Sequence, residues 1–329
     1  MDIIIDRACG LDVHKETVVA CIMGTDVKKE IRTYGTMTND LLRLKEWLTE
    51  NRITHIAMES TGVYWKPIFN ILEDSFELLL VNARHIKHVP GRKTDVKDSE
   101  WICKLLRSGL LKSSFVPPGD IRELRDLTRY RRKLTQSVSA EKNRVQKVLE
   151  DANIKLSSVV SDTFGATGSE IIDALIKGER TVEEMSSLAQ GRLKGKKNEL
   201  KEALVGNFRE HHIFMIRTSL EHIRSIEVLI AAIDRRIEEK IQPYRQEYEL
   251  LQTIPGVREQ GAASLLAEIG ADMDRFPTEE HLSSWAGMSP GSNESAGKKK
   301  WKKRPTEINS LRQLLPSAHG PHREKRIAI

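Results

Sequence analysis

The 329-residue chain is 39% hydrophobic and 30% charged, a composition typical of a globular protein with enough residues for two or three cores. No apolar run approaches the roughly 18 residues that a membrane span needs, and the first residues lack a signal-peptide pattern. Membrane and secreted proteins are therefore not expected. The isolated cysteines Cys9, Cys21 and Cys103 form no Cys-x-x-Cys pair and suit a reducing, cytoplasmic environment.

Positive charge is distributed unevenly along the chain. The net charge is +6, and residues 298–329 alone hold ten Lys or Arg against two Glu. Overall charge is therefore a weak argument for a nucleic-acid partner. Residues 84–147 hold 17 Lys or Arg against 7 Asp or Glu, a local excess that fits a phosphate-backbone contact. A solvated helix face is the alternative interpretation of the same run.

Residues 5–82 alternate strand and helix signals. Near-alternating β-branched runs predict strands over 9–15, 16–24, 25–36, 53–60 and 76–82. Amphipathic runs predict helices over 38–51, with an N-cap at Thr38 or Asn39, and over 62–74. This order, completed by a further helix, is that of an RNase-H-type mixed sheet. No Gly-x-Gly-x-x-Gly or Walker motif appears, so we predict an α/β RNase-H/RuvC-like domain over residues 1–116.

The rest of the chain is predicted to be mostly helical. Pro117 and Pro118 break the chain, and two long amphipathic helices follow, over 120–150 and 213–248. Their apolar stripes predict an antiparallel coiled-coil arm or a dimerisation seam in a region spanning 117–248, with shorter helices over 150–210 and an exposed turn over 191–199. The Ile-Pro-Gly-Val turn at 254–257, followed by a helix, resembles a helix-hairpin-helix unit, although two ordinary packed helices have the same pattern.

Four carboxylates are candidates for metal binding. Asp12 lies in the first predicted strand and Glu59 ends the fourth, and these strands are neighbours in an RNase-H-type sheet. Asp95 and Asp98 open the following helix, where their spacing of three places them on one face. Carboxylates held so close together repel one another unless cations neutralise them, and their hard oxygens suit Mg²⁺ or Mn²⁺. Two such ions can activate attack on a phosphodiester.

Each of these residues also has a purely structural interpretation. Asp12 could end a strand, Glu59 could cap the helix that begins near Thr61, and Asp95 could be an N-cap with Asp98 near the helix dipole. Each residue alone fits that interpretation better. The four together, in this order on this strand pattern, favour a metal site.

The sequence around these acids resembles the insertion-sequence transposases of the IS-one-ten family, which have an N-terminal RuvC-type DEDD domain. Two C-terminal stretches, 254–270 and 276–300, share the resemblance, which covers residues 5–300. It implies a prokaryotic, nucleoid-associated DNA transposase/recombinase that cleaves and exchanges strands with divalent metal. The implied partners are double-stranded DNA at the element ends and target, a structured noncoding bridge RNA, and further copies of the chain in a homodimer or a dimer of dimers.

The resemblance also implies roles for single residues. Ser295, in a serine transposase domain over 249–300, would attack a DNA phosphate and form a phosphoserine link, with the DEDD site coming from a partner subunit. From the residues alone, Ser295 needs activation by metal or a base, and its Ser- and Gly-rich surroundings are equally typical of a plain loop. The nucleic-acid contacts predicted from the basic residues are Lys15, Arg92, Lys93, Lys97, Arg129, Arg131, Arg132 and Lys298.

The last residues depart from the family pattern after Lys300. In another reading frame the codons for these residues can encode family-like residues, so residues 301–329 are predicted to be a frameshifted basic tail, which puts the activity of this copy in question. The coding DNA tests this prediction. Two rival functions stay open: a Holliday-junction-resolvase-like endonuclease, which needs the four carboxylates but no serine, and an inactive nucleic-acid-binding remnant.

Overall fold

The computed structural model describes residues 3–60, 62–82, 98–178 and 180–286, and the short strands at 294–295 and 298–299. The chain divides into two compact units, Met1–Gly119 and Asp120–Ile329. Among the described residues, no helix has the length and apolar character needed to cross a membrane.

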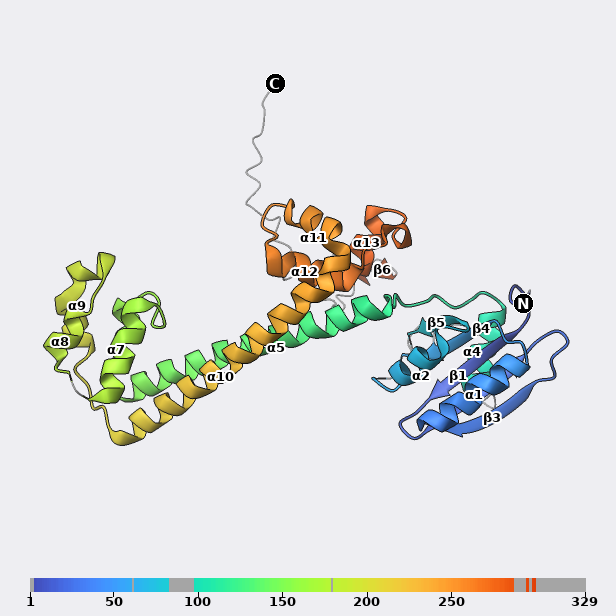
Figure 1. The fold of residues 1–329 in the computed structure, drawn as a ribbon, viewed down its shortest axis with the longest axis horizontal. Helices are drawn as coiled ribbons and strands as arrows, with labels where there is room; N and C mark the ends of the chain where they lie inside the picture. Colours follow the sequence, from blue (N-terminus) through green and yellow to red (C-terminus); the bar gives the residue numbers. More distant parts are fainter. Residues whose placement is uncertain are drawn as a thin grey trace, which may run out of the picture. The chain divides into compact units, whose positions relative to one another are not determined.

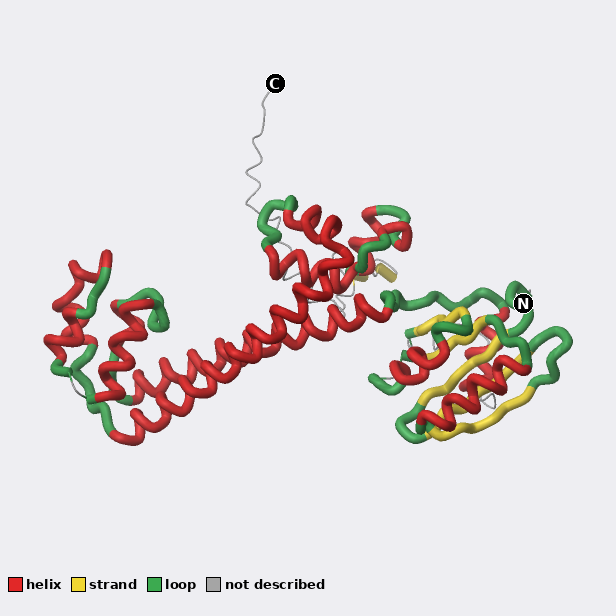
Figure 2. The backbone as a smooth tube through the Cα atoms, viewed as in Figure 1, coloured by secondary structure: helices red, strands yellow, loops and turns green. Residues whose placement is uncertain are grey.

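Unit 1 is built on a five-stranded mixed sheet (Figures 1 and 2). The strands are β1 (Ala8–Val13), β2 (Thr17–Met23), β3 (Glu30–Gly35), β4 (His55–Glu59) and β5 (Glu77–Val81). Their order is β3-β2-β1-β4-β5, with β2 antiparallel to both β1 and β3, and with β4 parallel to β1 and β5. The predicted order of elements and the mixed sheet are confirmed.

Helices cover both faces of this sheet. The side chains of Cys9, Leu11 and Val13 pack in one core with α1 (Thr38–Glu50) and α2 (Trp65–Leu72). Ala8, on the opposite face of β1, packs with α4 (Asp98–Arg107). This alternation is the period of a strand buried on both sides. The N-cap of α1 is Met37, which makes no side-chain cap bond, so the predicted cap at Thr38 or Asn39 is wrong.

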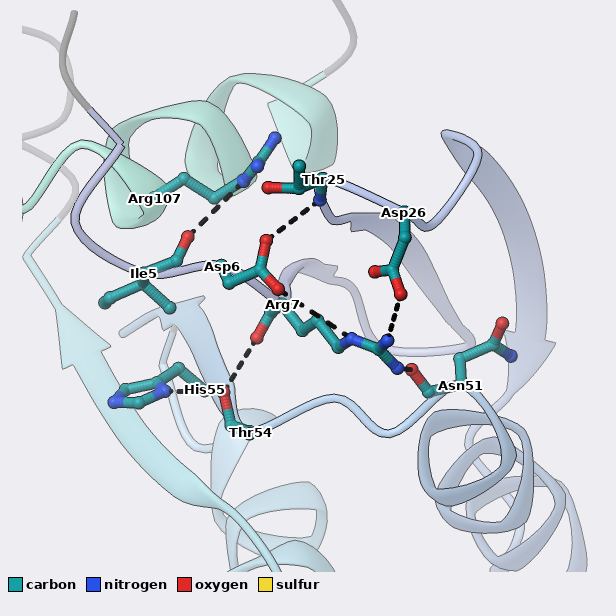
Figure 3. Close-up of polar contacts among 9 residues, drawn as sticks. All are labelled: Ile5, Asp6, Arg7, Thr25, Asp26, Asn51, Thr54, His55 and Arg107. Atoms are coloured by element: carbon teal, nitrogen blue, oxygen red, sulfur yellow. Dashed lines mark hydrogen bonds and ion pairs between the residues drawn. The ribbon is translucent and has the colours of Figure 1, made fainter.

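Polar contacts join neighbouring segments at the edge of the sheet where β1 begins (Figure 3). The guanidinium of Arg7 pairs with the Asp26 carboxylate and donates to the Asn51 carbonyl at 3.4 Å. The Thr54 hydroxyl donates to the Arg7 carbonyl at 2.9 Å. These bonds join the segments that precede β1 and β4 to the turn after β2, so this edge is occupied by structural contacts.

Unit 2 contains an antiparallel pair of long helices, α5 (Gly119–Asp151) and α10 (Glu210–Ile241) (Figure 1). The first residues of α5 pack with the last residues of α10, and the middles of the two helices pack with each other. The last residues of α5 pack with the first residues of α10. The two stripes predicted from sequence are the packed faces, and their buried residues are Leu124, Leu134, Val138, Val145, Ile216, Ile223, Ile226, Ile237 and Ile241.

Short helices connect the end of α5 to the start of α10. They are α6 (Leu156–Val159), α7 (Ala166–Lys177), α8 (Val182–Ser187), the 3₁₀ helix η1 (Gly191–Lys196) and α9 (Lys197–Ala203). Their own core includes Val145 and Leu149 of α5 and Ile216 of α10. Buried His212 accepts from the Arg209 backbone N–H at 3.0 Å and lies 3.0 Å from the Asp151 carboxylate, which fastens the start of α10 to the end of α5.

After α10 the chain forms a second helical group. It comprises η2 (Gln242–Tyr244), α11 (Arg245–Gln252), α12 (Glu259–Ile269), η3 (Met273–Arg275) and α13 (Glu279–Trp285). Between α11 and α12, Gly256 adopts φ of 86°, a left-handed conformation that favours glycine and matches the predicted tight turn. Residues of α12 share one core with Ile121 and Ile241, so the described residues on both sides of the predicted domain boundary at 248 pack together.

Candidate active site

Asp12 and Glu59 lie at the same edge of the sheet. The parallel register pairs Leu11 with Met58, and the next residues along the two strands are Asp12 and Glu59. Strand alternation places Asp12 on the same face as Ala8, and Glu59 on the same face as Ala57, and both alanines belong to the core beneath α4. Because adjacent strands lie about 4.8 Å apart, the two carboxylates are neighbours on the α4 face.

Helix α4 brings its first turn to this edge because it runs antiparallel to β1. The Cys103 thiol donates to the Ala8 carbonyl at 3.3 Å, and the Ile4 N–H donates to the Arg107 carbonyl at 2.8 Å. Toward the start of α4, a Cβ added at Gly10 would lie 2.2 Å from the Ser99 carbonyl oxygen. Only glycine permits this approach. Asp98, the residue before Ser99, therefore lies at the end of β1 that carries Asp12.

The donor chemistry of this edge fits a hard divalent cation, since Asp12, Glu59 and Asp98 offer only carboxylate oxygens. Asp95 lies outside the described residues. Within the described ranges, no three Asp, Glu, His or Cys side chains are grouped so as to hold a metal ion. The carboxylates thus share an edge and a face without forming a closed cage.

The alternative role of Glu59 as a helix cap does not hold. Helix α2 begins at Trp65, and its N-cap is Tyr64, whose side chain makes no cap bond. Asp12 does not end its strand either, because β1 continues to Val13. Asp98 does lie in the first turn of α4, where the helix dipole favours a negative charge.

His14 contacts the Asp12 carboxylate directly. Its Nε2 lies 3.2 Å from Asp12 Oδ2, and the two side chains are 60% and 22% exposed. The imidazole can fix the orientation of the carboxylate while remaining accessible to a ligand. Lys15, the next residue, is exposed in the same turn.

Glu100 anchors the first turn of α4 to the sheet, a role that the sequence did not suggest. Its carboxylate, 12% exposed, lies 2.7 Å from Lys104 Nζ and 3.3 Å from Lys29 Nζ, which follows β2. Hydrogen bonding from Lys104, and then from Lys29, holds the pKa of Glu100 below its ordinary value against the opposing effect of burial. The Lys29 partner is 71 residues away, so no local pattern signals it.

We expect Glu100→Gln to lower the free energy of unfolding at pH 7 by about 1 kcal/mol. The lowered pKa means that the wild-type carboxylate stabilises the fold above the unfolded-state pKa of about 4.3, and that this contribution is lost as pH falls. The difference should therefore vanish in acid. Urea unfolding at neutral and acidic pH measures it, with exposed Glu46→Gln as the control. A difference that persists in acid would contradict the role of the charge.

Two of the predicted nucleic-acid contacts have partners inside the chain. Arg129 donates two hydrogen bonds of 2.8 Å to the Glu268 carboxylate, and Arg131 forms a two-bond pair with Asp234. Glu268 is 5% exposed, so its pair with Arg129 joins α5 to α12. These pairs are structural, and a role for either arginine in phosphate binding stays a prediction, as it does for Arg132. Arg92, Lys93 and Lys97 lie outside the described residues.

Ser295 and Lys298 lie opposite each other in a short hairpin. Strands β6 (Glu294–Ser295) and β7 (Lys298–Lys299) pair antiparallel, with Ser295 in register with Lys298. The backbone register therefore pairs a lysine with the predicted serine nucleophile, a pairing that the loop interpretation did not anticipate.

Comparison with solved structures finds similarity to RuvC of Thermus thermophilus, at 13% identity over 33% of this chain and 99% of RuvC, with a TM-score of 0.25. The same protein in complex with a Holliday junction substrate matches at 11% identity, with the same coverage and a TM-score of 0.24. No curated protein matches the sequence.

Two transposase family profiles match the chain. A DEDD transposase profile of IS110 type matches residues 9–154, which include all four candidate carboxylates. A second profile, described as Transposase IS116/IS110/IS902 family, matches residues 248–319. This match passes Lys300, where the resemblance was expected to end, although the frameshift itself stays a prediction. Both profiles belong to one family and together span most of the chain, which is therefore a member of the IS110 family of transposases.

Proposed function

We propose that this transposase cleaves and exchanges DNA strands through the carboxylates at the edge where β1 and β4 end. The observation that carries the proposal is the placement of Asp12 and Glu59 on neighbouring strands and on one face, with the first turn of α4 at the same edge. Like charges at this spacing are stable only when a cation or a proton offsets them.

Asp12, Glu59, Asp95 and Asp98 would hold Mg²⁺ or Mn²⁺, which when bound stabilises negative charge on a phosphodiester oxygen. Other residues of the chain position the carboxylates and the DNA at this edge of the sheet. His14 orients Asp12, Gly10 and Glu100 fix α4, and Lys15 offers a positive charge to the DNA backbone.

Ser295 is the proposed nucleophile, attacking phosphorus while the DNA oxygen departs as the leaving group. A serine hydroxyl needs assistance to lose its proton, and Lys298, opposite in register, is one basic group available. Supply of the carboxylate site by a partner copy, assembly into a dimer or a dimer of dimers, and guidance by a structured RNA belong to the same proposal.

Substitution Ser295→Ala separates the three candidate functions. We expect it to abolish strand exchange on junction DNA with Mg²⁺, and Ser292→Ala, a neighbouring serine, to leave exchange unchanged. Gel assays of cleavage and joined products measure both. Cleavage retained by Ser295→Ala would favour the resolvase-like endonuclease. Salt-sensitive binding without cleavage by any variant, the unmodified chain included, would indicate an inactive remnant.

A further inference from the structure

The 3₁₀ helix η1 presents a cluster of cations between α8 and α9. Arg192, Lys194 and Lys197 are exposed, and among the described residues none of the three has a carboxylate partner. Their neighbours differ, since Lys196 pairs with Glu199 at 3.7 Å and Lys201 pairs with Glu183 at 3.9 Å. Three positive charges are thus left uncompensated on a short segment.

The segment that carries these cations packs against the core of the short helices. Leu193 is half-buried against the core of the short helices, and Leu200 and Leu204, in and just after α9, are buried in it. The Leu193 N–H donates to the Gln190 carbonyl at 3.1 Å. A cation held on an ordered backbone loses less entropy on binding than one on a free loop.

The backbone geometry brings two of the cations near each other. A 3₁₀ helix has three residues per turn and rises about 6 Å per turn, and Lys197, the first residue of α9, follows Lys194 of η1 by three residues. A Cβ added at Gly191 or Gly195 would meet nothing within 4 Å. No other part of the described chain therefore covers the backbone at these two glycines.

We propose that η1 and the start of α9 bind the phosphodiester backbone of a nucleic acid through Arg192, Lys194 and Lys197. A solvated turn is the simplest alternative, but such a turn does not require three unpaired cations to lie within six residues on a packed scaffold. The contact carries no base recognition, because lysines on an open surface bind phosphate without reading base edges. The site rests on the proposed nucleic-acid substrate and is independent of the carboxylate chemistry.

The test is a fluorescence-anisotropy titration without divalent metal over a series of salt concentrations, with every protein carrying Asp12→Asn to suppress cleavage. The variant Lys194→Glu/Lys197→Glu is compared with Lys28→Glu/Lys177→Glu, which changes the net charge equally on exposed lysines elsewhere in the chain. Each lost phosphate contact lowers the slope of log Kd against log salt by about 0.9 on duplex DNA. We expect the slope to fall by about two and the affinity by about 10-fold or more.

Two probes distinguish the sources of the backbone: a DNA duplex of arbitrary sequence and an RNA hairpin of equal stem length. A loss of affinity for one probe alone assigns the site to that nucleic acid. A loss of affinity for both probes shows that the site binds the backbone of DNA and of RNA. The proposal would be overturned if the η1 variant and its control lost affinity equally. It would also be overturned if the salt slope of the η1 variant were unchanged on both probes. Cleavage is not measured, so failure of the carboxylate mechanism leaves this test unaffected.

Discussion

Asp12→Asn is expected to reduce Mg²⁺-dependent DNA cleavage by about 10³-fold, because a metal site contributes several kcal/mol of transition-state stabilisation and each 1.36 kcal/mol is tenfold in rate. Asparagine keeps the size of the side chain and can still contact His14, so the loss follows from the missing charge. Single-turnover cleavage of junction DNA measures the effect.

Stability provides the second readout for this variant. Asp12 shares its edge with Glu59, so neutralising it removes a like-charge repulsion in the metal-free protein. The thermal midpoint without metal should therefore stay the same or rise while activity is lost. Asp74→Asn, at an exposed position beyond α2, is the control and should change neither quantity. If Asp12→Asn cleaved DNA at the rate of the unmodified protein, Asp12 would not be part of the metal site.

Gly10→Ala is expected to destabilise unit 1 by about 3 kcal/mol, the upper range for overpacking a core. The added methyl group would lie 2.2 Å from the Ser99 carbonyl oxygen and 2.5 Å from the Cys103 nitrogen. Both are backbone atoms, so no side-chain rotation relieves the contact and α4 must shift from β1. The shift would displace Asp98 as well, and cleavage should fall although no carboxylate is changed.

The matched control for this prediction is Gly195→Ala, where the new methyl group meets nothing within 4 Å. That substitution should leave stability unchanged or raise it by a few tenths of a kcal/mol through the entropy of the unfolded chain. Chemical unfolding monitored by circular dichroism compares the two variants. Equal stability of Gly10→Ala and the unmodified chain would show that α4 is not held against β1 as described.

Local periodicity was sufficient to predict most of the fold. The spacing of Ile216, Ile223 and Ile237 depends on one face of α10 being buried, and burial imposes a period that the sequence must follow. The order of strands and helices, which is that of an RNase-H-type sheet, placed Asp12 and Glu59 on neighbouring strands. The register that puts them on one face came from the structure, because it depends on hydrogen bonds between distant segments.

The contacts that complete the site were not predictable in this way. Gly10 within a strand signals a close approach, but not by which element. Arg129 was predicted to contact nucleic acid from its basic neighbours, and its partner Glu268 is 139 residues away in the sequence. A single charged residue carries no local signal that separates an internal ion pair from a phosphate contact, so only tertiary structure distinguishes the two.

The antiparallel course of α5 and α10 has an evolutionary consequence. The chain leaves one long helix and enters the other at the same place, where Val145 and Ile216 share a core with the intervening short helices. Residues lost or gained in that excursion do not alter the pairing of Ile121 with Ile241 at the opposite end. An insertion or deletion among these short helices is therefore expected to leave the packing of α5 against α10 at that opposite end unchanged.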